Sequence, residues 1–214
     1  MSPGLIIIGG GKGAQLIIDW AKSTAWKIAG ILDDNKEGEA FGHKILGAVS
    51  CLDAGGIIGK TLICSASSPR FRRHVWNLYH DDHNFINCFR SSVRYLRPDY
   101  GAGNVVFPDV SFDVFSVIGN NNVISAGSVI AHHCTIGSHN LFGPGVHLSG
   151  SVTIGDGNLI GSCVVVEPNV KIGNDCVIPS GTVVVKDLRD GTKITVRMGI
   201  DDRVYGGERK VRYA

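Results

Sequence analysis

The sequence has few aromatic residues, no long apolar run and no strong excess of either charge. Aromatic residues make up only 7% of the 214-residue chain. No apolar run approaches the roughly 18 residues that span a bilayer, and the N-terminal run at 5–8 is too short for a signal-peptide core. The 21 basic and 19 acidic residues leave a net charge of +2 without a basic block. We therefore expect a cytoplasmic protein that binds neither membranes nor nucleic acids.

The six cysteines are far apart in the sequence and include no C-x-x-C pair. This spacing excludes a zinc ribbon and indicates ordinary reduced thiols. The histidines match no zinc-ligand spacing, so we expect no metal site. Glycine, in contrast, is abundant, with 29 residues outside any low-complexity segment, which predicts tight turns at regular intervals.

The N-terminal part of the chain alternates between strand-like and helix-like patterns. A β-rich apolar run leads into a glycine turn, and helical apolar spacing follows the turn. Strands that alternate with helices predict a small Rossmann-like parallel sheet, and hence an α/β domain. The predicted elements are strand 4–8, turn 9–14, helix 15–22, strand 26–32, strand 61–65, helix 69–79 and strand 84–89.

From about residue 105 a six-residue period replaces the helical spacing. Fourteen apolar residues occupy every sixth position from Val106 to Val184 without a miss. From Ile118 onward, a small or medium-sized residue follows four positions after each of them, and glycine often follows directly. This pattern predicts a β-helix in which each hexad forms one short face and three hexads make one coil. The apolar residue of each hexad is expected to point inward.

These hexads resemble those of the left-handed β-helix acyltransferases, and the left hand is implied by that resemblance. With the N-terminal G-G-G-K-G-A turn and the segment I-L-D-D, residues 4–187 are similar to the bacterial nucleotide-sugar acetyltransferases. The resemblance is to the bacillosamine, perosamine and sialic-acid O-acetyltransferase types of this family. The likeness is carried mainly by residues 128–137, S-V-I-A-H-H-C-T-I-G, and by Phe142–Gly145 and Gly150.

The resemblance implies a homotrimer that binds acetyl-CoA between neighbouring left-handed parallel β-helices. It also implies three parts of the chain. Residues 1–95 form a nucleotide-sugar-binding α/β domain, 96–190 a β-helix acyltransferase domain and 191–214 a C-terminal tail. The family's usual C-terminal motif is replaced here at 197–203, which affects the expected contacts of the coenzyme tail.

His132 occupies the position of the family's proposed catalytic base. Histidine suits proton transfer because its ordinary pKa of about 6.5 lies near the working pH. The acidic residue that usually follows is His133 here, and it is the second predicted catalytic residue. His139 and His147 are alternatives for the missing acidic partner. Gly150 comes one 18-residue coil after His132, so the two should stack about 4.8 Å apart, with the Gly150 N–H open to a thioester carbonyl.

The turn at 9–14 follows a strand and opens a helix, so its backbone N–H groups are expected to hold phosphate oxygens. The domain has only about 90 residues, one half of a dinucleotide fold, which favours one nucleoside diphosphate over NAD. Acidic and hydroxyl residues after the second and third strands complete the expected site. The predicted substrate-binding residues are Gly9, Gly11, Lys12, Gly13, Asp33, Asp34, Ser65 and Ala66, with Arg70 and Arg73 as further candidates for the diphosphate.

On the coenzyme side, the resemblance assigns Ser180, Gly181 and Lys186, together with Gly150, to acetyl-CoA. Cys134 and Cys176 occupy inward positions of their hexads, so we expect direct transfer and no acyl-cysteine.

These observations predict an acetyl-CoA-dependent N-acetyltransferase that acts on a nucleotide-linked amino-deoxy sugar. UDP is the first choice of nucleotide, with dTDP and GDP left open by the sequence, and assembly of a cell-surface glycan such as lipopolysaccharide is the implied pathway. A sugar O-acetyltransferase of the sialic-acid type is the first alternative. A hydroxyl needs a base more than an amine does, so loss of the acidic neighbour favours the amine. A non-catalytic trimeric scaffold that binds nucleotide sugars is the second alternative.

Overall fold

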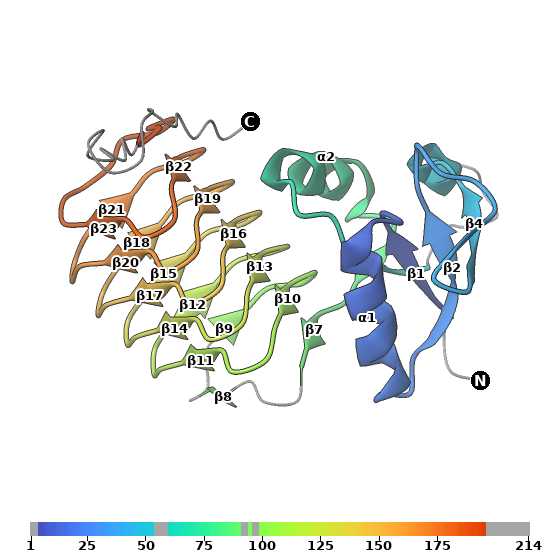
Figure 1. Ribbon diagram of the computed structural model, residues 1–214, viewed down its shortest axis with the longest axis horizontal. Coiled ribbons are helices and arrows are strands. Elements are labelled where there is room, and N and C mark those ends of the chain that lie inside the picture. The colour runs from blue at the N-terminus through green and yellow to red at the C-terminus, as the bar shows by residue number, and fades with distance from the viewer. Residues whose placement is uncertain (1–3, 54–59, 91–93, 96–98, 196–214) are drawn as a thin grey trace, which may run out of the picture.

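The computed structural model describes residues 4–53, 60–90, 94–95 and 99–195. They form an α/β domain and, beside it, a left-handed β-helix with three flat faces (Figure 1). The fold class predicted from the sequence is thereby confirmed. Neither helix in the described part of the chain has the length and apolar character that a membrane crossing requires.

The N-terminal domain is built on a six-stranded sheet in the order β3-β4-β2-β1-β5-β6. Strands β1 and β5 are almost wholly buried, as expected for parallel strands covered on both faces. The β3–β4 pair is antiparallel and was not predicted, because each partner is short and only partly buried. The elements are β1 (Gly4–Ile8), α1 (Lys12–Lys22), β2 (Lys27–Leu32), β3 (Glu39–Ala40), β4 (His43–Gly47), the 3₁₀ helix η1 (Val49–Asp53), β5 (Thr61–Cys64), α2 (Pro69–Tyr79) and β6 (Asn84–Phe85).

The two helices cover opposite faces of this sheet. Ile17 of α1 belongs to the same buried cluster as Ile7 of β1. Val75 of α2 instead belongs to a cluster with Ile6, whose side chain points the other way from the strand. The α1 cluster also contains Val123 of the β-helix, so the β-helix packs against the α1 side of the sheet.

The β-helix has three parallel sheets, here called face I, face II and face III. Face I contains β7, β10, β13, β16, β19 and β22, face II contains β8, β11, β14, β17, β20 and β23, and face III contains β9, β12, β15, β18 and β21. Face I is the one that packs against the N-terminal domain. The strands are β7 (Cys88–Phe89), β8 (Arg94–Tyr95), β9 (Asp99–Tyr100), β10 (Val105–Val106), β11 (Ser111–Phe112), β12 (Val117–Ile118), β13 (Val123–Ile124), β14 (Val129–Ile130), β15 (Thr135–Ile136), β16 (Leu141–Phe142), β17 (His147–Leu148), β18 (Thr153–Ile154), β19 (Leu159–Ile160), β20 (Val165–Val166), β21 (Lys171–Ile172), β22 (Val177–Ile178) and β23 (Val183–Val184).

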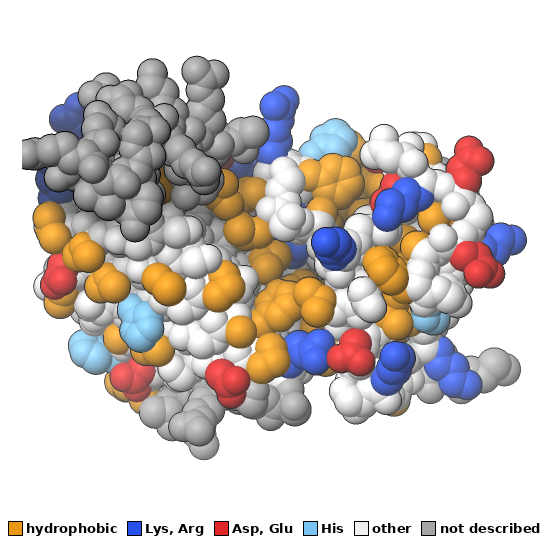
Figure 2. All heavy atoms as spheres, in the orientation of Figure 1, with side chains coloured by type: hydrophobic (Ala, Val, Ile, Leu, Met, Phe, Trp, Pro, Cys, Tyr) orange, Lys and Arg blue, Asp and Glu red, His pale blue; other side chains and the backbone are white. Residues whose placement is uncertain are grey.

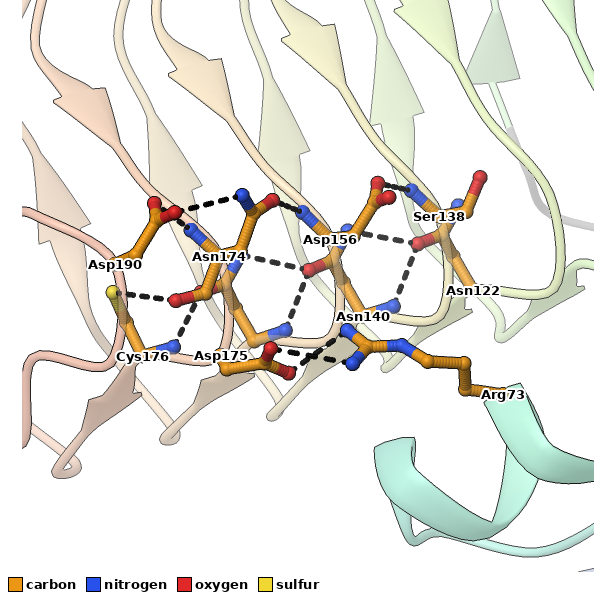
Figure 3. Close-up of polar contacts among 10 residues, drawn as sticks. Arg73, Asn122, Ser138, Asn140, Asp156, Asn174, Asp175, Cys176 and Asp190 are labelled. Carbon is orange, nitrogen blue, oxygen red and sulfur yellow. Dashed lines mark hydrogen bonds and ion pairs between the residues drawn. The ribbon is translucent and has the colours of Figure 1, made fainter.

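The fourteen apolar residues of the six-residue period form the core of the β-helix. Each of them is at most 4% exposed, so the inward orientation predicted for them is confirmed. The second inward position carries asparagine in several coils at the corner between faces III and I. The side-chain oxygen of Asn122 accepts a hydrogen bond from the backbone N–H of Asn140, and Asn140 does the same for Asn158. This ladder joins successive coils (Figure 3).

The strands of the β-helix begin earlier in the chain than the sequence predicted. The predicted strand 84–89 is two strands: β6 belongs to the α/β sheet, whereas β7 pairs with β10 on face I. Strand β8 likewise pairs with β11 before the proposed boundary at residue 95. The division into domains at that point stays a proposal, and residues 196–214 of the predicted tail lie outside the described residues.

Candidate active site

All eight residues predicted to bind the nucleotide line one pocket of about 490 Å³. It lies where β1, β2 and β5 end, the edge at which parallel α/β sheets usually bind ligands. The pocket also includes residues that the sequence did not single out, because they look like ordinary loop residues. These are Asn35, Val49, Ser68 and Phe71.

The glycine turn brings the start of α1 close to β5. A Cβ atom at Gly13 would overlap the carbonyl oxygen of Ser65, so only glycine allows this approach. Gly9 has a φ of 97°, a conformation that side chains with a Cβ rarely adopt. Gly11 is the N-cap of α1, and neither a capping side chain nor an acidic residue occupies its first turn. The first N–H groups of the helix therefore face the pocket free for an anion.

Asp33 and Asp34 hold the backbone of the pocket in place. The Oδ2 atom of Asp33 accepts a hydrogen bond from the Gly10 N–H at 2.6 Å, and its Oδ1 accepts one from the Asn35 N–H at 2.9 Å. Asp34 accepts a hydrogen bond from the Val49 N–H at 2.8 Å. These contacts give both carboxylates a structural role in addition to the binding role predicted for them.

Lys36 is a cation of the site that the sequence did not reveal. Its Nζ donates a hydrogen bond to the Gly10 carbonyl oxygen at 2.6 Å, beside the glycine turn. In the sequence, a lysine two residues after an acidic pair looks like an ordinary solvent-exposed residue. Lys36 lies beside the glycine turn because β2 pairs in parallel with β1, so both strands end at the same edge of the sheet.

The pocket at the glycine turn continues into an apolar cleft of about 450 Å³ between α1 and face I. Both hollows are lined by Lys12, Gly13 and residues 65–67. Figure 2 shows hydrophobic side chains gathered in this space between the two domains. At its far end the cleft reaches the corner between faces I and II, where Ser180 lies and accepts a hydrogen bond from the Ser162 N–H at 3.0 Å. Gly181 is the next residue of the same corner.

His132 lies at a different corner, between β14 of face II and β15 of face III. Its carbonyl oxygen accepts a hydrogen bond from the Ser151 N–H, which aligns it with Gly150 on the next coil. A Cβ at Gly150 would come within 2.6 Å of Cε1 and 2.8 Å of Nε2 of His132. The imidazole therefore lies directly against Gly150, and among the described residues none accepts a hydrogen bond from the Gly150 N–H. Lys186 is exposed in the turn after β23, at this same corner.

The neighbouring histidines differ in their relation to His132. The Nδ1 atoms of His132 and His133 are 3.1 Å apart. His139 lies at the corner between faces III and I, where it contacts Trp76 of α2, so it does not partner His132. Burial, and to a smaller extent the Arg73 charge, lower the pKa of His139 to about 4. His147 is exposed on the outer side of β17, in register with Val129.

The three arginines in the first half of α2 have different surroundings. Arg72, which the sequence did not single out, is fully buried, and its guanidinium donates to the carbonyl oxygens of Cys64, Ala66, Gly103 and Asn121 and to the Asn121 side chain. It thus joins the nucleotide-pocket loop to the β-helix, and its burial lowers its pKa. Arg73 forms an ion pair with Asp175 at 2.8 Å (Figure 3), whereas Arg70 is exposed.

The structure thus groups the predicted site residues in two places of one chain. The residues predicted to bind the nucleotide share a continuous hollow with Ser180, whereas His132, Gly150 and Lys186 lie at the corner opposite face I. In the part of the chain that the structure describes, no three His, Cys, Asp or Glu side chains are grouped as metal ligands.

Two sequence families match the chain. The PglD N-terminal domain matches residues 4–77, and the bacterial transferase hexapeptide (six repeats) matches residues 115–150 and 151–186. No curated protein sequence matches the chain.

Several solved structures share the fold over both domains. PerB from Caulobacter crescentus, in complex with CoA and GDP-perosamine, is 27% identical with a TM-score of 0.80, over 89% of this chain and 92% of that chain. The acetyltransferase domain of PglB from Neisseria gonorrhoeae FA1090, in complex with acetyl coenzyme A, is 21% identical with a TM-score of 0.79, over 90% and 96%. WeeI from Acinetobacter baumannii AYE is 17% identical with a TM-score of 0.75, over 90% and 96%. The last two likenesses concern the fold alone.

Proposed function

The chain belongs to the bacterial nucleotide-sugar acetyltransferase family and is an acyltransferase, and we propose that it acetylates the amino group of a nucleotide-linked amino-deoxy sugar with acetyl-CoA. One observation carries this proposal. The pocket at the glycine turn opens into the apolar cleft along face I, which gives a nucleotide and its attached sugar one continuous path to the β-helix. The mostly apolar lining of the cleft suits a deoxy sugar.

The nucleoside diphosphate occupies the pocket of Gly9–Gly13 and Asp33–Asp34 in this proposal. Its phosphates lie against the uncapped start of α1, with Lys12 and Lys36 as nearby cations. Asp34 is the acidic group available to the ribose or the base. PerB was crystallised with GDP-perosamine, whereas UDP is the nucleotide expected from the sequence, so the assay must include both.

The complete active site needs two copies of the chain. The nucleotide cleft and Ser180 belong to face I and its corner with face II, whereas His132, Gly150 and Lys186 are on the opposite corner. A sugar held along face I therefore meets His132 of a neighbouring copy in the proposed homotrimer. Acetyl-CoA then lies between the Ser180–Gly181 corner of one copy and the His132 corner of the next. The cytoplasm stays the predicted compartment.

The proposed transfer is direct. The sugar amine attacks the thioester carbon, its proton moves to Nε2 of His132, and the C–S bond breaks as the amide forms. The Gly150 N–H donates a hydrogen bond to the carbonyl oxygen as negative charge develops on it. The protonated His132 then returns its proton to the CoA sulfur. Because Gly150 lies against the imidazole, the base and the oxyanion donor are within one coil of each other.

The test is CoA release from acetyl-CoA with a panel of UDP-, GDP- and dTDP-linked amino sugars and their hydroxyl counterparts. We expect turnover on one amino sugar, and a loss of at least about 100-fold in His132→Asn with acetyl-CoA binding retained. Turnover only on a hydroxyl sugar would support the O-acetyltransferase alternative. Absence of turnover on every sugar, with nucleotide-sugar binding intact, would support the non-catalytic scaffold.

A further inference from the structure

His133 directly contacts the side chain of His132. The two Nδ1 atoms are 3.1 Å apart, and the rings are nearly perpendicular, at 84°. When both imidazoles are neutral, only one of these nitrogens carries a proton and the other must accept it. The protonation of one ring therefore fixes the tautomer of the other.

His133 is held in this position at an energetic cost. Its φ is 58°, a left-handed conformation that a bulky side chain rarely adopts. Phe115, one coil earlier in the same column, has a φ of 61° and is 70% exposed. In the two later coils the column carries Ser151 and Asn169, which are smaller. The left-handed conformation recurs at this turn position throughout the β-helix, so this corner differs by the two bulky rings that occupy it on successive coils.

The ring of Phe115 supports the ring of His133. Their centroids are 4.9 Å apart, with an interplanar angle of 38°. This stacking orients the His133 imidazole so that Nδ1 faces His132. Among the ion pairs in the described part of the chain, none involves His132 or His133, so no carboxylate competes for the His132 Nδ1 proton.

Resting on the proposed function, we infer that His133 is a positioning residue that accepts the Nδ1 proton of His132 and shares the charge formed in the reaction. In the resting pair, His132 carries a proton on Nδ1 and His133 on Nε2. The Nε2 atom of His132, on the side of Gly150, then has the free electron pair that a base needs.

The proton movements of this pair balance over one turnover. As the amine gives its proton to Nε2 of His132, the proton between the rings moves to Nδ1 of His133, and the positive charge passes to the second ring. When the CoA sulfur takes the proton from Nε2 of His132, the inter-ring proton returns to Nδ1 of His132. Both imidazoles are neutral again, and the amine proton is on the thiol.

Three substitutions at His133 distinguish two roles of this residue: fixing the tautomer of His132 and taking up part of the positive charge. His133→Asp accepts the hydrogen bond and also neutralises an imidazolium, His133→Asn accepts it without taking up a proton, and His133→Phe does neither. The equivalent turn position, with the same positive φ, holds Phe115 one coil earlier at this corner and Asp109 and Asn121 at the other two corners, so this backbone conformation accommodates all three residue types. We expect kcat near the native value for Asp, about tenfold lower for Asn and roughly 10- to 100-fold lower for Phe, with the KM of acetyl-CoA changed less than twofold.

The outcomes distinguish this inference from the proposed function. If His133→Phe keeps kcat within twofold of the native chain, or if His133→Asp falls as far as Phe, His133 has no such role, even though the acetyltransferase proposal stands. A rise in the KM of acetyl-CoA with unchanged kcat would make His133 a coenzyme contact and would overturn the inference. Absence of turnover by the native chain would refute the proposed function and this inference together.

Discussion

At the scale of single residues, the contact between Gly150 and His132 depends on a missing Cβ atom. A methyl group at Gly150 would lie 2.6 Å from Cε1 of His132, closer than real Cβ contacts allow, so Gly150→Ala must displace the imidazole. The ring is on an exposed corner and can move without disturbing the core. We expect kcat to fall about 10- to 100-fold in Gly150→Ala, since misplacing a catalytic group costs this much, while the unfolding temperature stays within about 2 °C.

Gly191→Asn is the matched control for this substitution. Gly191 has a φ of 70° and open space around its Cβ position, and asparagine tolerates that conformation. Native kcat in both variants would mean that the position of the His132 ring does not limit acetyl transfer.

The predicted site residues whose gathering in one pocket could be foreseen are those whose position follows from local pattern. The glycine turn, Asp33 and Ser65 each follow a predicted strand, and strand ends meet at one sheet edge, so their gathering in one pocket could be foreseen. Lys36 and Arg72 could not be found in this way. Their roles depend on contacts with Gly10 and with Asn121, which are 26 and 49 residues away in the chain.

At the scale of elements, the six-residue period predicted the β-helix because each apolar residue has the same environment in every coil. The period predicted less about the other inward position, which tolerates both asparagine and valine. Asparagine there builds a hydrogen-bonded ladder, as from Asn122 to Asn140. The β3–β4 hairpin was missed for a different reason. A two-residue strand such as Glu39–Ala40 is too short to show an alternation of apolar and polar residues.

Helix α2 packs on the β-helix through a histidine that stays neutral in the folded state. His139 is buried against Trp76 and next to the Asn121 side chain, and its pKa is lowered to about 4. In the unfolded chain the ordinary pKa is about 6.5, so below that pH the unfolded state binds the proton that the folded state refuses. The stability contributed by neutral His139 is therefore complete above pH 6.5 and declines as the pH falls toward 4.

The measurement is urea unfolding of the native chain and of His139→Asn between pH 7 and pH 4. Asparagine occupies the same corner position one coil earlier, at Asn121, and does not titrate, which makes it the matched variant. We expect the free energy of unfolding of the native chain to lose up to about 3 kcal/mol more than that of the variant over this range. Parallel pH curves for the two proteins would contradict the assignment.

At the scale of the whole molecule, the two domains are joined rigidly enough to fix the direction of the cleft. Arg72 connects the carbonyl oxygens of Cys64 and Ala66 at the nucleotide pocket to Gly103 and Asn121 of the β-helix. Buried charges without an ionic partner are rare, and the Arg72 guanidinium has each of its N–H groups hydrogen-bonded to an oxygen. A nucleotide sugar held by the N-terminal domain is consequently aimed along face I of its own β-helix.

That geometry leads to a prediction about subunits. Within one chain, the cleft on face I and His132 are on opposite sides of the β-helix, so in the proposed homotrimer each active site combines the cleft of one copy with His132 of a neighbour. Gly11→Glu removes the first half, because a side chain at Gly11 meets open space and brings negative charge to the phosphate site. His132→Asn removes the second half, and each variant alone is expected to be inactive.

Co-expressed in equal amounts with two different affinity tags, these variants should regain activity in mixed oligomers. A competent site pairs an intact cleft from a His132→Asn subunit with an intact histidine from a Gly11→Glu subunit. Each mixed trimer contains one such pairing, so doubly purified trimers should have about a third of the native sites. The measurement is CoA release by doubly purified oligomers, with each homo-oligomer as the control at equal concentration. A mixed oligomer as inactive as its parents would mean that the cleft and the histidine of a site belong to one chain. The proposed path of the sugar along face I to His132 of a neighbouring copy would then be wrong.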